Sequence, residues 1–256
     1  MITRSQAKRV RKLRTRKRRE EEAFLAEGIR VVEELLGSSL EVEFIVVSPA
    51  LSDTPRGVRL LEAAGQRGLT LVEVADDELG GLADTKTPQG VLAVAREPVR
   101  QLEDFAPGEK AAVLAFDRVV DPGNLGTLLR TADALGVGWS LAAPGSVDPW
   151  SPKVVRASAG SVFYLPVTRE PWPVALSWLR EREFAILCAD PGGEPVTRRG
   201  SAPDRFVLVL GNEPSGLSAE VRSGCSGLVA VQLPGRMDSL NVAIAGALLL
   251  DRLLAG

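Results

Sequence analysis

The segment DPGNLGTLLRTADALG, residues 121–136, decides how the second half of this chain is interpreted. Its apolar residues recur at intervals of three and four, which predicts a helix with one apolar face. These are Leu125, Leu128, Leu129, Ala132 and Leu135. Gly136 is placed to end the helix, and Gly126 and Arg130 are expected on the opposite side. A glycine inside a helix is unfavourable. Gly126 therefore either exposes backbone beside Arg130 to a ligand or lets a neighbouring helix pack closely.

Length and composition predict a soluble globular protein with one large or two modest domains. The chain has 256 residues, of which 45% are hydrophobic and 25% charged. No apolar run approaches the roughly 18 residues of a membrane span, and the start lacks the apolar core of a secretion signal. Cys188 and Cys225 lie far apart without metal-ligand spacing. We expect buried thiols in a reducing compartment, no metal site and no membrane association.

The charges are distributed unevenly along the chain. Residues 1–19 hold ten of the 31 Lys and Arg residues and no Asp or Glu. The remaining 21 basic residues face 33 acidic ones, so residues 20–256 carry a net charge of −12. A basic arm on an acidic body predicts electrostatic binding to phosphates. A solvated tail is the alternative, and a mitochondrial presequence or a nuclear signal would have a similar composition.

The first half alternates between helical and strand-like segments, which predicts a small α/β unit at residues 20–98. EEAFLAEGIRVVEELL, residues 21–36, predicts a helix with one apolar face made by Phe24, Leu25, Ile29, Val32, Leu35 and Leu36. Further helices are expected at 56–68 and 76–84, and strands at 41–49, 69–75 and 90–97. The polar segment between Pro98 and Pro107 predicts a linker at 99–108, so a second domain spans 109–256.

The second half predicts an open parallel α/β sheet covered on both faces. Strand-like segments occur at 111–119, 139–143, 163–167, 184–190, 206–212 and 227–234. Ligands bind such sheets beyond the carboxyl ends of the strands. DRVVDPGNLG (117–126), GNEPSGLS (211–218) and LPGRMDSLN (233–241) are the loops expected there. No G-x-G-x-x-G follows the first strand, which argues against a nucleotide-dependent oxidoreductase.

Three of these segments, in this order, resemble the motifs of the SpoU-type (TrmH-like) RNA ribose 2′-O-methyltransferases. They are DPGNLGTLLRTADALG, LVLGNEPSGLS (208–218) and VQLPGRMDSLNVAIAGALLL (231–250). SPKVVRASAGSVFYLPV (151–167) is also similar to that family. FLAEGIRVVEELL (24–36) and TPQGVLAVA (87–95) resemble its RNA-substrate-binding domain. The resemblance covers essentially the whole chain after the basic arm.

The resemblance implies the SPOUT fold, a parallel sheet with a C-terminal trefoil knot, beside the small N-terminal RNA-binding domain. It implies S-adenosylmethionine as the cofactor, a homodimer through the C-terminal domain, and methylation of a ribose 2′-hydroxyl in structured RNA. A separate N-terminal domain favours ribosomal (23S) RNA, with transfer RNA as the alternative. A location in the cytoplasm follows from this class. A non-catalytic RNA-binding protein of the same fold would keep the basic arm without an intact cofactor site.

The resemblance also implies the site residues. The catalytic positions are Asn124, Arg130, Glu213, Ser239 and Asn241. The cofactor-binding positions are Leu210, Gly211, Asn212, Val231, Leu233, Met237 and Leu240. Because the chain contains no histidine, the commonest general base is missing. Arg130 would act as the base, as is usually proposed for the family, or would stabilise the developing oxyanion while the proton leaves to phosphate or water. Ser239 and Asn241 also suit the start of a helix.

Overall fold

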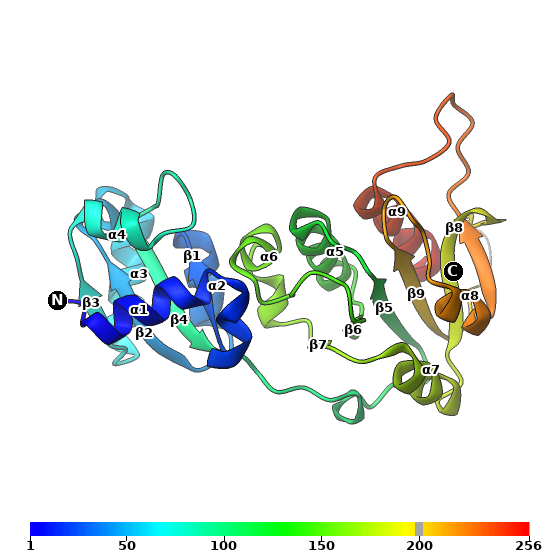
Figure 1. The fold of residues 1–256 in the computed structure, drawn as a ribbon, viewed down its shortest axis with the longest axis horizontal. Coiled ribbons are helices and arrows are strands. Elements are labelled where there is room, and N and C mark those ends of the chain that lie inside the picture. The colour runs from blue at the N-terminus through cyan, green and yellow to red at the C-terminus, as the bar shows by residue number, and fades with distance from the viewer. Residues whose placement is uncertain (198–201, 256) are drawn as a thin grey trace. The chain divides into compact units, whose positions relative to one another are not determined.

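The computed structural model describes residues 1–197 and 202–255, which form two compact units. The N-terminal unit comprises Met1–Val99 and Trp150–Tyr164, and the C-terminal unit comprises Arg100–Pro149 and Leu165–Gly256. The chain therefore crosses from one unit to the other three times. Figure 1 colours the elements of both units in chain order.

The N-terminal unit is built on a mixed four-stranded sheet with the strand order β1-β4-β2-β3. Strand β4 is antiparallel to β1 and β2, and β2 is parallel to β3. The strands are β1 (Ala23–Glu27), β2 (Val42–Val47), β3 (Leu71–Glu73) and β4 (Val91–Arg96). The helices are α1 (Arg4–Leu13), α2 (Ile29–Gly37), α3 (Pro55–Gln66), α4 (Asp76–Leu82) and α6 (Pro152–Ala157). The expected small α/β unit is thus present.

The helix predicted over residues 21–36 is wrong in its first half. Residues Ala23–Glu27 form β1, which is buried along its whole length, and α2 begins only at Ile29. Gly28 separates the two elements with a φ of 95°, a backbone conformation that glycine adopts without a steric penalty. A short run of consecutive apolar residues is compatible with a fully buried strand and with a buried stretch of helix. Periodicity alone therefore does not distinguish the two.

Residues Trp150–Tyr164 complete the core of the N-terminal unit. The rings of Trp150 and Phe163 lie 4.7 and 5.5 Å from the ring of Phe24 in β1. Arg156 in α6 forms ion pairs with Asp84 (3.1 Å) and with the buried Glu27 (3.7 Å). The sequence assigned this segment to the second domain, but its side chains pack within the first unit.

The C-terminal unit contains a six-stranded sheet in which every neighbouring pair is parallel, as predicted. The strand order is β10-β8-β9-β5-β6-β7. The strands are β5 (Ala111–Asp117), β6 (Trp139–Ala142), β7 (Val167–Thr168), β8 (Ala185–Pro195), β9 (Arg205–Gly211) and β10 (Gly227–Ala230). Strand β7 is shorter than predicted, because Ser161–Phe163 form a 3-10 turn, η4, instead. The three motif loops follow β5, β9 and β10, so all three leave the sheet at the carboxyl ends of its strands.

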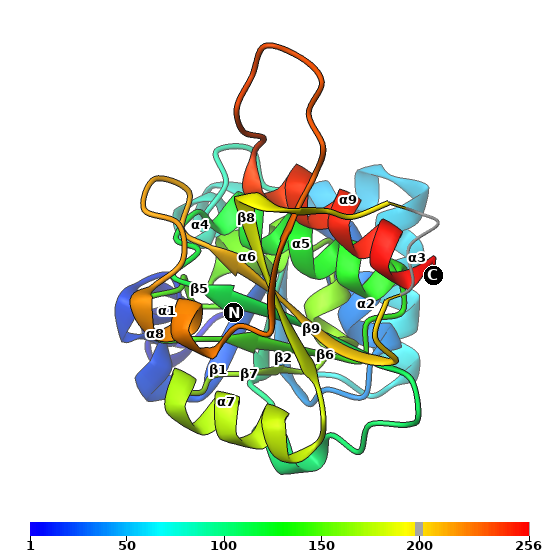
Figure 2. The same ribbon diagram turned by 90° about the vertical axis from the view of Figure 1, so that its right-hand side faces the viewer.

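Helices cover both faces of this sheet (Figure 2). Helices α5 (Pro122–Ala134) and α9 (Val242–Leu254) lie on one face, and α7 (Trp172–Glu181) and α8 (Ala219–Gly224) lie on the other. Gly246 lets α9 approach closely, since a Cβ there would come within 2.6 Å of the side chains of Leu128 and Leu210. The C-terminal helix α9 therefore packs directly against α5 and β9.

Helix α5 confirms the prediction from residues 121–136 at both ends. Asp121 caps the first turn by accepting a hydrogen bond from the backbone N–H of Asn124 (2.8 Å). Gly136 follows the helix with a φ of 76°. Gly126, however, is buried together with Leu125. Its predicted place on an exposed face of the helix was therefore wrong.

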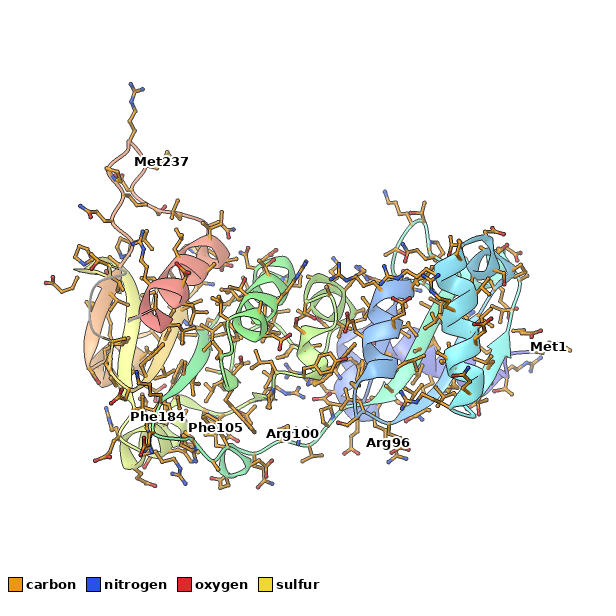
Figure 3. All side chains as sticks on the ribbon, turned by 180° about the vertical axis from the view of Figure 1, so that it is seen from behind. Met1, Arg96, Arg100, Phe105, Phe184 and Met237 are labelled. Atoms are coloured by element: carbon orange, nitrogen blue, oxygen red, sulfur yellow. A yellow bond between two sulfur atoms is a disulfide. The ribbon has the colours of Figure 1, made fainter. Side chains whose placement is uncertain are left out.

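Part of the predicted linker belongs to the core of the C-terminal unit. Leu102 is buried, and the ring of Phe105 lies 5.2 Å from that of Trp139 and 6.5 Å from that of Phe184. Figure 3 labels Phe105 and Phe184, which lie close together in the C-terminal unit. The extended connection between the units is consequently shorter than residues 99–108.

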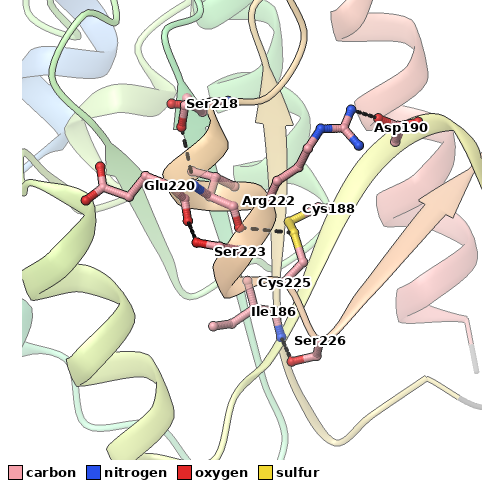
Figure 4. Close-up of a disulfide and its surroundings, with 11 residues drawn as sticks. Ile186, Cys188, Asp190, Ser218, Glu220, Arg222, Ser223, Cys225 and Ser226 are labelled. Atoms are coloured by element: carbon pink, nitrogen blue, oxygen red, sulfur yellow. Dashed lines mark hydrogen bonds and ion pairs between the residues drawn. A yellow bond between two sulfur atoms is a disulfide. The ribbon is translucent and has the colours of Figure 1, made fainter.

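The two cysteines form a disulfide bond, which corrects the expectation of separate thiols. Cys188 lies in β8 and Cys225 follows α8, with their Cα atoms 6.1 Å apart (Figure 4). Beside the bond, Arg222 of α8 forms an ion pair with Asp190 of β8. The two cysteines are 37 residues apart in the sequence and come together only through the folding of the C-terminal unit, so the sequence did not predict the bond.

We expect the oxidised protein to be more stable than the reduced protein by about 2–4 kcal/mol, because the bond constrains a long loop in the unfolded chain. Urea unfolding with and without a thiol reductant measures the difference. Cys225→Ser is the control, and its unfolding midpoint should not respond to the reductant. Equal midpoints for the oxidised and reduced wild-type protein would contradict a stabilising disulfide.

Candidate active site

The pairing of β5 with β9 brings two motif loops together. Asp117, the last residue of β5, lies opposite Gly211, the last residue of β9. The loop that enters α5 and the turn that follows β9 therefore leave the sheet side by side. Gly246 holds α9 against α5, and the third motif loop runs into the start of α9.

One residue from each motif enters a continuous hydrogen-bond network. Nδ2 of Asn124 donates to Oε1 of Glu213 (2.8 Å), and Oδ1 of Asn124 accepts from Nδ2 of Asn241 (3.0 Å). Asn241 also caps α9 by accepting from the backbone N–H of Ala243 (2.9 Å). The network fixes the orientation of the Asn124 amide, because each end of that amide has its own partner. Three of the five predicted catalytic residues are brought together in this way.

Arg130 and Ser239 stay outside this network. Arg130 is exposed on α5, six residues and about 9 Å of helix axis beyond Asn124. Within the part of the chain that the structure describes, its guanidinium makes no hydrogen bond or ion pair. Ser239 is exposed before α9 and likewise has no hydrogen-bonded partner among the described residues. Both side chains are free to contact a bound molecule.

The predicted cofactor positions at the end of β9 make contacts within the protein. Leu210 is fully buried beneath α9. A Cβ at Gly211 would lie 2.7 Å from the carbonyl carbon of Gly216, so a turn folds back onto this glycine. Asn212 closes that turn through two backbone hydrogen bonds with Gly216, of 3.1 and 2.8 Å. Gly211 is therefore needed for a close approach of the chain to itself.

The predicted cofactor positions after β10 lie on a more exposed segment. Val231 and Leu233 are half-buried, whereas Leu240 is 37% and Met237 71% exposed. Figure 3 shows Met237 on the long loop that stands away from the sheet. Residues 232–240 exchange no backbone hydrogen bonds with the described parts of the chain. Apolar side chains and free backbone polar groups are thus available together on this loop.

Asp117, which the sequence analysis did not select, holds the end of β5 in place beside the motif loops. It is 1% exposed, and its carboxylate accepts hydrogen bonds from the backbone N–H of Ser218 (2.6 Å) and from Nε1 of Trp172 (2.9 Å). These bonds tie the end of β5 to α7 and to the segment that follows the β9 turn. The available signal was an acidic residue at the end of an apolar strand.

The basic N-terminal segment is folded as part of the N-terminal unit. Helix α1 begins with a capping box between Thr3 and Gln6 and buries Val10 and Leu13 against the sheet. Arg18 is 1% exposed and donates to the carbonyl of Ala23 (3.0 Å). The predicted arm is accordingly an amphipathic helix followed by a 3-10 turn, η1 (Arg16–Glu21).

The basic residues of α1 fall into two groups. Arg9 pairs with Glu43 (2.7 Å), and Lys12 pairs with Glu21 (2.6 Å) and Glu20 (3.0 Å). The hydrogen bonds to Glu21 and Glu20 raise the pKa of Lys12. The exposed side chains of Arg4, Lys8 and Arg11 follow one another at helical spacing along α1 and form no ion pair within 4 Å among the described residues. This row, the α1 basic stripe, is free to bind anions.

Other parts of the chain give weaker indications of a site. A cavity of about 310 Å³ lies near Ala111 and Phe206, where β5 and β9 begin, at the sheet edge opposite the motif loops. Among residues 1–197 and 202–255, no group of acidic, cysteine or histidine side chains is arranged to hold a metal ion. In the same residues, no helix is long and apolar enough to cross a membrane.

The parallel sheet and the hydrogen-bond network between its loops define the candidate site. Comparisons with known proteins identify the family to which the chain belongs. The SpoU rRNA Methylase family matches residues 111–251, and the MRM3-like substrate binding domain matches residues 4–93. The chain belongs to the SpoU rRNA Methylase family, which confirms the resemblance of its three motifs.

Similar proteins match nearly the whole chain. The 23S rRNA (guanosine(2553)-2′-O)-methyltransferase RlmP of Bacillus subtilis is 34% identical, over 94% of this chain and 93% of its own length. The AdoMet-bound rRNA methyltransferase from Sinorhizobium meliloti is 31% identical, with a TM-score of 0.85 over 99% of this chain and 95% of that one. The SpoU methyltransferase AviRb from Streptomyces viridochromogenes, in complex with AdoMet, is 26% identical, with a TM-score of 0.89 over 98% of this chain and 97% of that one.

Proposed function

We propose that this protein transfers a methyl group from S-adenosylmethionine to a ribose 2′-hydroxyl of ribosomal RNA. The observation that carries the proposal is the Asn124–Glu213–Asn241 network, which joins all three family motifs at one end of the sheet. The rRNA substrates named for the relatives favour ribosomal over transfer RNA. A non-catalytic RNA-binding protein would have no need to keep this network intact.

The residues after β10 fit S-adenosylmethionine. Adenosine is recognised by backbone polar groups around the base and by apolar side chains against its faces. Val231, Leu233 and Leu240 offer apolar surface on a segment whose backbone groups are free of other described partners. These residues, with Met237 and the turn at Gly211, would hold the cofactor. When bound, it supplies an electrophilic methyl group.

Asn124 and Glu213 prepare the acceptor side of the reaction. Glu213 fixes the Asn124 amide through one hydrogen atom, which leaves the second amide hydrogen for a ribose or phosphate oxygen. Asn241 holds the opposite end of the amide. The arrangement orients the acceptor and restricts its motion, which lowers the entropic cost of an in-line displacement.

Arg130 contributes positive charge to the reacting oxygen. An arginine guanidinium keeps its proton in proteins, so we assign Arg130 to stabilising the oxyanion that forms as the 2′-hydroxyl attacks. The proton then leaves to a phosphate oxygen or to water. Because Arg130 is exposed and has no partner among the described side chains, RNA can supply that partner.

The α1 basic stripe supplies affinity for the RNA backbone. Arg4, Lys8 and Arg11 project from one side of a helix that is anchored by Val10 and Leu13. The match of the substrate-binding domain begins at residue 4 and therefore includes this helix. We propose that the unit of residues 1–98 binds RNA and the domain of 109–256 performs catalysis, with Trp150–Tyr164 belonging physically to the former.

Three further features complete the proposal. The C-terminal domain carries the trefoil knot of the SPOUT fold, and the protein acts in the cytoplasm, where rRNA is modified.

The protein forms a homodimer through α9. Ile244 of α9 is 54% exposed, and Leu248 lies one turn further and is half-buried. A second copy of the chain would cover this apolar face.

Arg130→Ala is expected to lower methyl transfer by about 100-fold or more, as for the loss of one oxyanion-stabilising group. Binding of S-adenosylmethionine, measured by calorimetry, should remain. Tritium transfer to an rRNA transcript at saturating cofactor measures the rate. Arg130→Lys should also be impaired, because it keeps the charge without the planar fork.

Arg180→Ala is the control for Arg130, since it removes another exposed helical arginine, in α7. Its activity should equal that of the wild type. Full activity of Arg130→Ala would remove Arg130 from the mechanism. A wild-type protein that binds RNA but not the cofactor would favour the non-catalytic alternative.

Replacing Arg4, Lys8 and Arg11 together by Gln should weaken RNA binding for all sequences. Each lost phosphate contact should reduce the slope of log K against log salt by about 0.7–0.9, because fewer counterions are released. Filter binding over a series of salt concentrations measures both effects.

The matched control for the stripe removes three exposed cations elsewhere, by replacing Arg100, Lys110 and Arg180 with Gln. It changes the net charge equally and should leave the slope near that of the wild type. Equal slopes for both triple variants would reduce the stripe to a general charge effect.

Ile244→Glu should convert a dimer into a monomer, because it places a charge in the apolar contact. Light scattering coupled to size-exclusion chromatography measures the mass, and circular dichroism checks the fold. Val174→Glu is the control, since Val174 is 50% exposed on α7 and lies outside the proposed interface. A monomeric wild type at micromolar concentration would contradict the dimer.

A further inference from the structure

Arg118, the first residue after β5, has an unusual backbone conformation. Its φ is 60°, in the left-handed region that L side chains other than Asn and Asp seldom adopt. Glycine or asparagine would fit this position with less strain. The guanidinium of Arg118 makes contacts that a glycine could not make.

Arg118 contacts both ends of the turn that follows β9. Its carbonyl oxygen accepts a hydrogen bond from Nδ2 of Asn212 (2.9 Å), and its Nη2 donates to the carbonyl oxygen of Gly216 (3.2 Å). Asn212 and Gly216 are themselves joined by two backbone hydrogen bonds. The turn of residues 212–216 is therefore held at its base by one residue of the neighbouring loop.

The path of the Arg118 side chain is restricted by its surroundings. A Cβ on Gly145 would come within 2.9 Å of Cγ of Arg118, so the aliphatic part passes close to the Gly145 backbone. Nε lies 3.6 Å from Oδ1 of the buried Asp117. Asp117 in turn binds the backbone N–H of Ser218, just beyond the turn. Packing and charge thus direct the guanidinium toward Gly216.

Glu213 is the residue that this turn presents. Its carboxylate reaches Asn124 in α5 and has no other hydrogen-bonded partner within the described residues. Asn124 cannot place Glu213 alone, because a single hydrogen bond leaves the turn free to rotate about it. The base of the turn must be fixed from elsewhere.

We propose that Arg118 is a positioning residue that holds the turn of residues 212–216, so that Glu213 meets Asn124 at the methyl acceptor site. The proposal rests on the proposed function in one respect, namely that Asn124 and Glu213 orient the RNA ribose. Arg118 itself need not touch the RNA or the cofactor.

Arg118→Asn separates positioning from general stability. Asparagine adopts the left-handed conformation more readily than arginine, so the variant keeps the backbone and removes the guanidinium. Its midpoint of thermal unfolding should equal or exceed that of the wild type. A residue that serves only stability would instead lower the midpoint when its hydrogen bond is removed.

The placement of Glu213 can be read from the Asn124 side-chain amide in a ¹H–¹⁵N correlation spectrum. This resonance is assigned by its loss in Asn124→Ala. It should move toward the position of a solvent-exposed amide in Arg118→Asn and in Glu213→Ala, which removes the acceptor oxygen. Arg118→Lys keeps a cation of similar reach and should move it less.

Glu183→Asn is the matched control. Glu183 also has a left-handed φ, of 59°, and it is exposed between α7 and β8 with no side-chain partner in the described chain. The substitution relieves the same kind of strain away from the site. The Asn124 resonance and the methyl-transfer rate should both remain at their wild-type values.

Methyl transfer supplies a second measurement. Arg118→Asn should lower kcat by roughly ten- to a hundredfold, the scale expected for a misplaced site group, and should lower it little further in a Glu213→Ala background. Unchanged Asn124 resonance in Arg118→Asn, or a loss of activity that adds fully to that of Glu213→Ala, would overturn the proposal.

If Glu213→Ala has full activity while the Asn124 resonance still depends on Arg118, the positioning of Glu213 stands and its proposed part in the reaction is wrong. If the resonance is independent of Arg118 while Glu213→Ala is inactive, the proposed function stands and the role of Arg118 is wrong.

Discussion

The register between β5 and β9 is the constraint on which the candidate site depends. Asp117 and Gly211 end their strands opposite each other, so the two loops that follow begin a single strand spacing apart. A shift of the register would separate Asp117 from Ser218 and Asn124 from Glu213. The buried side chains on both faces of these strands resist such a shift, because it would move them out of their packing positions. The fixed register of the sheet thereby fixes the relative positions of the side chains in the loops that follow β5 and β9.

The proposed catalytic residues supply two amides, one carboxylate, one hydroxyl and one guanidinium. With no histidine in the chain, no side chain changes charge at its ordinary pKa between pH 5 and 8. Asn124 and Asn241 form directional hydrogen bonds that do not titrate. Such a site can orient a hydroxyl group and stabilise developing charge, while the proton is passed to groups outside the protein. A weakly pH-dependent orienting step is the natural consequence.

Several parts of this arrangement could be predicted from the sequence. The parallel sheet and α5, from its Pro122 start to Gly136, were encoded by local patterns of apolar residues and caps. The family motifs led us to propose catalytic roles for Asn124, Glu213 and Asn241, and the structure shows that their side chains meet. Features that depend on tertiary contact were missed or misassigned. The strand at Ala23–Glu27 has a pattern that equally fits a helix, and the burial of Gly126 depends on what packs against it. The disulfide and the left-handed Arg118 have no local signal, because the fold alone brings their partners close.

The membership of Trp150–Tyr164 in the N-terminal unit bears on how the protein is made. Domains generally fold as units while the chain emerges from the ribosome, the N-terminal one first. Here Phe24 has to wait for Trp150 and Phe163, and Glu27 for Arg156, until more than one hundred further residues have been synthesised. The first unit is therefore completed only after β5, α5 and β6 of the second have left the ribosome. The synthesis and folding of the two units are therefore interleaved, and the N-terminal unit does not fold to completion before the C-terminal unit is begun.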